Sequence, residues 1–341
     1  DYTPYSAIET DDVTTGVGSD VELTYRYTSS MHTPQYGPCN NEDGAYTMIF
    51  VGKNGADKVT DEDYREDIEV DKDGKFKVSF DKPGTYVVSG RYYNNDDTRG
   101  ACNAYCKVTV LDAVEYAQKT IDALDDITLN SEKAIEEAKK AYNLLTDEQK
   151  EQIKNADAIK TAEEKLSKLQ VEDAESKISA IGDVTLDSKD AIKDARDTYD
   201  ALTDDQKKQV TNYDVLQKAE SELSDLQKAD AVVTKIKNIG KVTLKSESKI
   251  KQARTAYNKL TDKQKTLVTN YDVLEKAEKD LADLKAADQV SKNITNIGTV
   301  TLESEDAIKE ARTAYDALTD AQKELVSNKD VLEKAEKDLA D

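Results

Sequence analysis

Hydrophobic residues in the C-terminal two thirds of the chain recur at helical spacing. After Ser188, the residues Ile192, Ala195, Tyr199 and Leu202 lie three or four positions apart, which would place them on one face of an amphipathic helix. A stripe of this kind is typical of the core of a small helical bundle, and we favour that interpretation over a surface for a partner helix. The pattern does not sustain the heptad of a long coiled coil.

This helical pattern occurs four times. The segment Val/Ile-Thr-Leu-x-Ser begins at Ile127, Val184, Val242 and Val300, so the period is 57, then 58, then 58 residues. Periods of this length are typical of tandem structural modules. We therefore divide the helical part of the chain into four repeats, at residues 112–170, 171–227, 228–285 and 286–341.

Each repeat carries signals for the ends of its helices. Ser188 is predicted to cap the first helix, with its hydroxyl accepting a hydrogen bond from the first turn. Thr203 and Gln206 form the capping box of a short second helix, which is expected to end near Asn212 in a left-handed C-cap. The same box recurs at Thr146 and Gln149, at Thr261 and Gln264, and at Thr319 and Gln322.

A long helix is predicted to join neighbouring repeats. From Asp214 to Ile239 the chain contains no glycine, proline or turn cluster, and it then reaches Gly240, which we expect to adopt a left-handed conformation. Gly182 and Gly298 occupy the equivalent positions. Because bending a helix breaks backbone hydrogen bonds, shared helices of this kind predict an elongated rod of four all-α three-helix bundles.

The first 111 residues show a strand pattern instead. Val21–Tyr25 alternates apolar and polar side chains, Tyr46–Val51 is an apolar run, and Thr85–Tyr92 and Ala104–Leu111 give two further strands. Residues 68–80 are predicted to form a hairpin around an Asp-Gly turn. All four prolines and ten of the thirteen glycines precede residue 112, which places a domain boundary there.

About seven short strands in residues 1–111 predict an all-β, immunoglobulin-like (Ig-like) sandwich. Tyr86, which follows Pro83-Gly84, would be the tyrosine corner of such a domain, where the hydroxyl binds an upstream backbone group. Val88 stands where antibody domains have their second core cysteine, and the chain has no tryptophan. Another small antiparallel sandwich is the alternative.

The helical repeats resemble a family of repeats in large secreted and cell-wall proteins of Gram-positive bacteria. The resemblance rests on I-x-x-I-G-x-V-T-L-x-S…A-R-x-x-Y-x-x-L-T-x-x-Q-K…V…N-Y-D-V-L-x-x-A-E-x-x-L-x-x-L between Ile178 and Leu226, and it covers about two thirds of the chain. It implies an extracellular location at the surface of a Gram-positive bacterium. It also implies a spacer or adhesion stalk joined to other domains. The sandwich is similar to bacterial Ig-like modules in general.

Charge and hydropathy limit the expected partners. The net charge of −22 argues against nucleic acid and against an anionic lipid surface, and it favours a monomer. No stretch of 18 apolar residues is present, so we expect no direct membrane contact. We expect the chain to be a segment of a longer protein, with its export signal and wall anchor outside it.

The sequence offers no catalytic constellation. His32 is the only histidine, and no phosphate-binding or nucleophile-elbow motif occurs. Asp71-Lys-Asp73-Gly74 lacks the remaining ligands of a calcium loop. We therefore predict that the chain is not an enzyme and uses no metal or cofactor.

Three cysteines in an exported protein suggest one disulfide and one free thiol. If the stretch is extended, Cys102 and Cys106 are ~13 Å apart at their Cα atoms, too far to bridge each other. Cys39 would then pair with one of them. We favour Cys39–Cys102, because both would lie in loops at one end of the sandwich, and Cys39–Cys106 is the alternative.

The best candidate for a contact surface is that same end of the sandwich. One loop carries Asn95, Asp96 and Arg99 beside Tyr92 and Tyr93. A second loop carries His32 and Tyr36. Loops at one end of a sandwich commonly bind ligands, although an ordinary polar loop is the simpler interpretation.

Three functions are compatible with these features. The first is a non-enzymatic cell-surface stalk that presents a binding head. The second is a module that binds a host glycan or a host protein such as immunoglobulin. The third is the accessory region of a larger secreted carbohydrate-active enzyme. In each case the cell wall would be reached through regions outside this segment.

Overall fold

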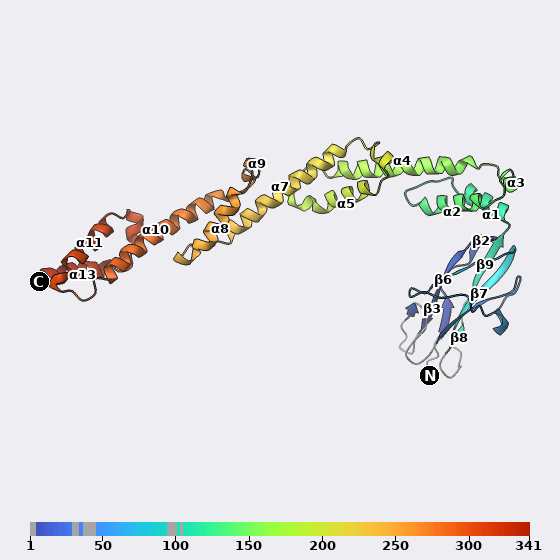
Figure 1. Cartoon of the computed structure of the whole chain (residues 1–341), viewed down its shortest axis with the longest axis horizontal. Helices are drawn as coiled ribbons and strands as arrows, with labels where there is room; N and C mark the ends of the chain where they lie inside the picture. Colours follow the sequence, from blue (N-terminus) through green and yellow to red (C-terminus); the bar gives the residue numbers. More distant parts are fainter. Residues whose placement is uncertain (1–4, 29–33, 37–45, 94–100, 103–104) are drawn as a thin grey trace. The chain divides into compact units, whose positions relative to one another are not determined.

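The computed structural model describes residues 5–28, 34–36, 46–93, 101–102 and 105–341 (Figure 1). A β region of two sheets is followed by helices in a repeat-like arrangement. Two compact units divide the chain, at residues 1–170 and 171–341.

Nine strands in the described residues form the two sheets. One sheet has the order β4-β3-β1-β8, with β6 also paired to β3, and the other has the order β2-β9-β7-β5. Their bounds are β1 (Tyr5–Ile8), β2 (Val13–Gly16), β3 (Val21–Thr28), β4 (Pro34–Tyr36), β5 (Tyr46–Val51), β6 (Lys75–Val78), β7 (Gly84–Tyr93), β8 (Ala101–Cys102) and β9 (Cys106–Leu111). A 3-10 turn, η1 (Asp61–Asp63), follows β5.

The two sheets share one hydrophobic core. Leu23 and Tyr25 of β3 are fully buried against Val88 and Val108 of the other sheet. Gly90 on β7 permits this close approach, since a Cβ there would lie 2.4 Å from the ring of Tyr25. The predicted strand pattern for Val21–Tyr25, Tyr46–Val51 and Thr85–Tyr92 is therefore confirmed.

The predicted contact between the Tyr86 hydroxyl and an upstream backbone group is present. The Tyr86 hydroxyl donates a hydrogen bond to the backbone carbonyl of Lys82 at 2.9 Å. The ring of Tyr86 packs on Phe80, with 4.3 Å between the ring centroids.

The predicted hairpin over residues 68–80 is wrong. The turn forms, because the Asp71 carboxylate accepts hydrogen bonds from the backbone N–H groups of Asp73 and Lys75. Only the second arm is a strand, however, and it pairs with β3, not with residues 68–70. That pairing buries Phe76 and Val78 in the core, a long-range gain that a local turn signal does not reveal.

The helices of the first unit begin directly after β9. Asp112 caps the first of them, with its carboxylate accepting from the backbone N–H of Val114 at 2.9 Å. Tyr116 then packs on the backbone of β2, where a Cβ at Gly16 would lie 2.5 Å from its ring. The helices are α1 (Ala113–Asp122), α2 (Glu132–Asn143), α3 (Asp147–Lys150) and α4 (Asp157–Ala180).

The second unit repeats one order of elements. A 3-10 turn leads into a helix, a one-turn helix follows, and a longer helix completes the set. The elements are η2 (Leu186–Ser188), α5 (Lys189–Asp200), α6 (Asp204–Lys207), α7 (Tyr213–Lys237), η3 (Leu244–Ser246), α8 (Glu247–Asn258), α9 (Asp262–Lys265), α10 (Tyr271–Thr295), η4 (Leu302–Ser304), α11 (Glu305–Asp316), α12 (Asp320–Glu324) and α13 (Lys329–Ala340).

The long helix predicted between Asp214 and Ile239 is confirmed as α7, one unbroken ribbon in Figure 1. Leu216 in its first half lies in one hydrophobic cluster, and Ile236 in its second half lies in the next. Both side chains are fully buried. Beyond the helix Gly240 has φ +63°, and the left-handed conformation predicted for this position is thereby confirmed.

The four predicted capping boxes are present, but Ser188 acts differently from its prediction. Its hydroxyl accepts a hydrogen bond from the backbone N–H of Thr185 at 2.9 Å and caps no turn of α5. Thr185 in turn accepts from the N–H of Asp187 at 3.3 Å. An additional 3-10 turn thus precedes the helix, and the cap belongs to that turn.

The predicted left-handed C-cap at Asn212 is wrong. Asn212 has φ −120° and sits at the N-cap of α7. Its side-chain amide donates to the carbonyl of Glu175 on α4 at 2.9 Å, so it ties the start of α7 to the preceding long helix. This partner lies 37 residues away, which is why local spacing did not identify it.

This asparagine leaves one buried atom without a partner. The Oδ1 atoms of Asn212, Asn270 and Asn328 are buried and accept no hydrogen bond from any residue that the structure describes. In the first repeat the equivalent Asn155 does have a donor, because the side chain of Gln118 reaches its Oδ1 at 2.7 Å. A buried acceptor without a hydrogen-bond donor lowers the free energy of unfolding by about 1–3 kcal/mol.

Ser291 on α10 occupies the position of Gln118, so Ser291→Gln should supply the missing donor to Asn328. We expect the free energy of unfolding to rise by about 1 kcal/mol, measured by urea unfolding of the full chain with circular dichroism. Ser291→Met is the matched control, since it extends the side chain without a donor. An equal effect of both variants would contradict the explanation.

Candidate functional surfaces

The structure describes only part of the predicted tip of the sandwich. Tyr36 lies on β4, where its backbone is opposite Arg26, and thus belongs to the first sheet. Tyr92 and Tyr93 end β7 in the second sheet, opposite Thr47 and Tyr46. The other residues predicted at this tip, His32, Asn95, Asp96 and Arg99, lie outside the described residues, so a contact surface there stays a prediction.

Cys106 is a free thiol on β9. Its side chain is fully buried in the sandwich core, and in the strand register it lies opposite Val88. This argues against the alternative Cys39–Cys106 disulfide, because the Cys106 side chain lies in the core and not at a loop. Cys39 lies outside the described residues, and of Cys102 only the backbone in β8 is described, so the Cys39–Cys102 pairing stays a prediction.

Burial controls the chemistry of this thiol. It raises the pKa of Cys106 to about 11, with further contributions from the negative charges of Asp12 and Asp11. The Sγ atom lies 3.6 Å from the backbone carbonyl of Asp11. A thiol of this kind stays protonated and unreactive at neutral pH.

An arginine clamp recurs between the helices of the second unit. Arg254 on α8 donates two hydrogen bonds to the carboxylate of Glu278 on α10, at 2.7 and 2.6 Å. The rings of Tyr257 and Tyr271 stack with their centroids 4.4 Å apart, and the Arg254 guanidinium lies within 5.5 Å of both ring centres. The pKa of Arg254 is raised, chiefly by its hydrogen bond to Glu278.

The same clamp forms in the preceding repeat, where Arg196 contacts Glu220 and the stacked Tyr199 and Tyr213. Each tyrosine already uses a ring face for its neighbour, and Lys207 lies 5.7 Å from the Tyr199 ring centre as well. This arrangement favours a structural role at the edge of the core over stacking on a sugar.

The outer repeats keep the ion pair without the second tyrosine. Arg312 pairs with Glu336 at 2.5 Å in the fourth repeat, where Lys329 takes the tyrosine position. Lys139 pairs with Glu163 at 2.6 Å in the first. The link between helices therefore depends on the cation and the carboxylate.

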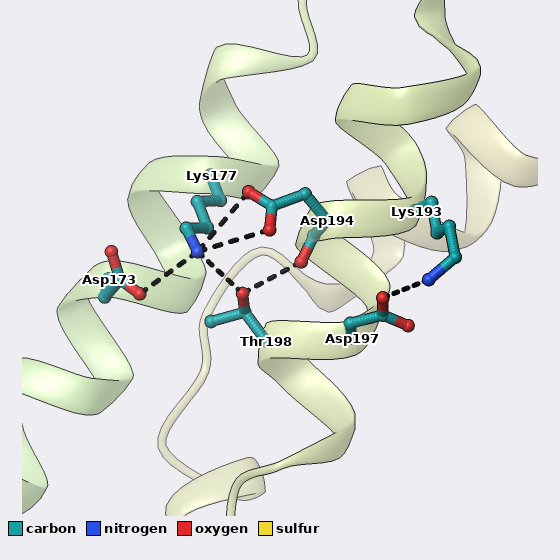
Figure 2. A network of polar contacts seen from close by, with 6 residues as sticks. All are labelled: Asp173, Lys177, Lys193, Asp194, Asp197 and Thr198. Atoms are coloured by element: carbon teal, nitrogen blue, oxygen red, sulfur yellow. Dashed lines mark hydrogen bonds and ion pairs between the residues drawn. The ribbon is translucent and has the colours of Figure 1, made fainter. Parts of the chain in front are cut away.

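Figure 2 shows a second polar network, between α4 and α5. The Lys177 ammonium lies 3.6 Å from Asp173 and 3.3 Å from Asp194, and it donates to the Thr198 hydroxyl at 2.9 Å. Lys193 and Asp197 form an ion pair one helical turn apart on the same helix. The lysines on this face are thus neutralised by carboxylates.

The equivalent face of the third repeat is different, and the sequence analysis missed it. Lys235 stands in the place of Lys177, but its neighbours there are Gln252 and Ala256 in place of Asp194 and Thr198. These residues line a shallow hollow of about 780 Å³ on α7, η3 and α8. Counting the charges of each repeat separately would have revealed this basic face. A single count over residues 112–341 combines it with the acidic repeats and hides it.

The described residues contain no group of three or more His, Cys, Asp or Glu side chains placed to hold a metal ion. None of the described helices has both the length and the apolar character required to cross a membrane.

Comparison with known proteins gives little to identify the chain. No family model and no curated protein matches it. Four chains among the solved structures match. One is a non-cellulosomal cohesin from the hyperthermophilic archaeon Archaeoglobus fulgidus, 8% identical, with a TM-score of 0.17. The match covers 32% of this chain and 92% of the cohesin, and at this TM-score it carries no argument.

The buried thiol gives a direct test. We expect Cys106 of the native protein to react with iodoacetamide at pH 8 at least about tenfold more slowly than in the unfolded chain, because its raised pKa and its burial both suppress the reactive thiolate. Mass spectrometry of the separate cysteine peptides measures this. Alkylation of Cys106 only after reduction would instead mean that it is disulfide-bonded.

Proposed function

We propose that this chain is a non-enzymatic segment of an extracellular protein at the surface of a Gram-positive bacterium. In this proposal four three-helix bundles form a stiff stalk, and an Ig-like domain is the binding head that the stalk presents. The head would take a host glycan or host protein. The resemblance of the repeats to those of Gram-positive cell-wall proteins supports the location.

The observation that carries the stalk proposal is the sharing of α7 and α10 by successive hydrophobic clusters. In α10, Leu274 packs in one cluster and Ile294 in the next, just as Leu216 and Ile236 do in α7. Flexing at such a junction would break backbone hydrogen bonds and expose apolar side chains to water.

Polar contacts at mid-helix support the same proposal. Gln264, which completes the capping box of α9, also donates to the Asp225 carboxylate in the middle of α7 at 2.8 Å. Lys263 pairs with the same carboxylate at 3.1 Å. Gln322 makes the equivalent contact with Asp283 on α10 at 2.8 Å. Each short helix thereby braces a junction where the backbone passes from one cluster to the next.

The Tyr86–Lys82 contact supports an Ig-like domain as the head, because this contact is a recurring feature of such sandwiches. The absence of a catalytic motif in the sequence supports a role in attachment instead of catalysis. The proposed binding role of the head is independent of the proposed stalk, and a separate binding assay tests it.

A five-residue Gly-Ser insertion after Gln227, between the two halves of α7, tests the stalk. We expect small-angle X-ray scattering of the wild-type chain to show one extended distance distribution. The insertion should broaden that distribution and shift it to shorter distances, because the two clusters would no longer share one helix.

The matched control places the same insertion after Gly55, in an exposed turn of the β region with φ +78°. It should leave the long distances unchanged. The stalk proposal fails if the wild-type chain scatters as a compact globule, or if the two insertions have the same effect.

A further inference from the structure

The third repeat has a charge opposite to that of its neighbours. Residues 228–285 contain 14 lysines and arginines against 8 acidic residues, a net charge of +6. The second repeat, residues 171–227, has a net charge of −8, and the fourth, residues 286–341, has −6. The positive charge is therefore local to one module of an acidic chain.

Part of the change lies on one face of a 3-10 turn and the helix that follows it. In the second repeat this face carries four carboxylates, at Asp187, Asp190, Asp194 and Asp197. The third repeat has Lys245, Ser248, Gln252 and Thr255 at the equivalent positions. The fourth repeat returns to acidic residues at three of them, with Glu303, Asp306 and Glu310. The spacing of three and four residues places the last three positions on the same side of the helix, and the first lies in the 3-10 turn that precedes it.

These substitutions expose a set of lysines. Lys235, Lys245, Lys251 and Lys259 line the hollow on α7, η3 and α8, and all four are exposed. Lys251 pairs with Glu247 at 2.7 Å, and Lys285 shares that carboxylate at 2.8 Å. No carboxylate among the described residues lies within ion-pairing distance of the other three.

We propose that this hollow binds a linear anionic polysaccharide, one that carries carboxylate or sulfate groups along its length. The lysines would contact the anionic groups, and Ser248, Gln252 and Thr255 would hydrogen-bond sugar hydroxyls. An open surface suits an extended polymer that enters and leaves it. At physiological salt, charges act over about 8 Å, so the acidic repeats on either side do not cancel this attraction.

The lining of the hollow disfavours single-stranded nucleic acid. That ligand binds to basic grooves that also offer aromatic side chains for base stacking, and no aromatic residue lines this hollow. An acidic repeat of a second copy of the chain is the competing occupant, and a measurement of self-association distinguishes it from a polysaccharide. The polysaccharide proposal stands independently of the stalk proposal, because it concerns the surface of one repeat.

Heparin is a suitable probe, with the full chain titrated by calorimetry at about 50 mM NaCl and again at higher salt. The variant Lys235→Gln/Lys245→Gln/Lys259→Gln should bind heparin at least about tenfold more weakly. The slope of log affinity against log salt concentration should become smaller in magnitude by about two to three. The matched control Lys218→Gln/Lys334→Gln/Lys337→Gln removes the same charge from exposed positions of the acidic repeats and should bind as the wild type does.

A gain-of-binding variant complements this loss. Asp173→Ala/Asp187→Lys/Asp190→Ser/Asp194→Gln/Asp197→Thr/Ala201→Lys transfers the face of the third repeat to the second, where Lys177 already takes the place of Lys235. The change at Asp173 removes a carboxylate that pairs with Lys177. Every new residue occurs naturally at the equivalent helical position, so folding should be retained, as circular dichroism can verify. The variant should bind heparin at a second site.

The proposal is overturned by any of four results. The first two are that the wild type does not bind heparin, and that the two lysine variants lose heparin affinity equally. The third is that oligothymidylate binds as tightly as heparin. The fourth is that the wild type self-associates in the ultracentrifuge and the Lys235/Lys245/Lys259 variant does not. Dextran, a polysaccharide without charge, is the ligand control and should bind neither the wild type nor the variants.

Discussion

The burial of two apolar stripes on each long helix, one on each half and facing different sides, is the constraint on which the helical part of this chain depends. A helix such as α7 cannot cover its own hydrophobic side, so its first half packs with the helices before it and its second half with those after it. The side chains that fill one cluster are therefore fixed to the same backbone as those that fill the next. Caps, glycines and arginine clamps serve this arrangement by defining where each helix begins, ends and meets its neighbour.

This constraint separates the interior of the repeats from their surface. Core residues such as Ile192, Ile250 and Ile308 hold the same place in successive repeats and are almost fully buried. The exposed faces have no such role, so their charges differ between repeats without disturbing the packing. The basic hollow of the third repeat is one of these differences, and lysine, serine, glutamine and threonine there replace the aspartates of the second repeat at equivalent positions.

The predictions from sequence succeeded where the determining interactions are local. A capping box joins residues three apart, and a left-handed C′ position requires only a glycine next to a helix end. The predictions at Asn212 and residues 68–80 were wrong because the partner lies far away in the sequence. The prediction at Ser188 was wrong although its partner, Thr185, is only three residues away, because an additional 3-10 turn precedes the helix. Asn212 binds a carbonyl 37 residues away, and β6 pairs with a strand more than 50 positions before it. The basic hollow was missed because charges were counted over all the repeats together.

By itself, the sequence determined the helical periodicity, the four copies, the ends of most helices and the strand character of the first 111 residues, because each of these follows from neighbouring side chains and backbone geometry. The tertiary structure decided which strands pair, which carbonyl each asparagine holds, that Cys106 faces the core, and that Lys235 joins the lysines of η3 and α8 on one surface. These depend on segments that meet only after folding, when burial of apolar area selects among pairings that local sequence leaves equivalent.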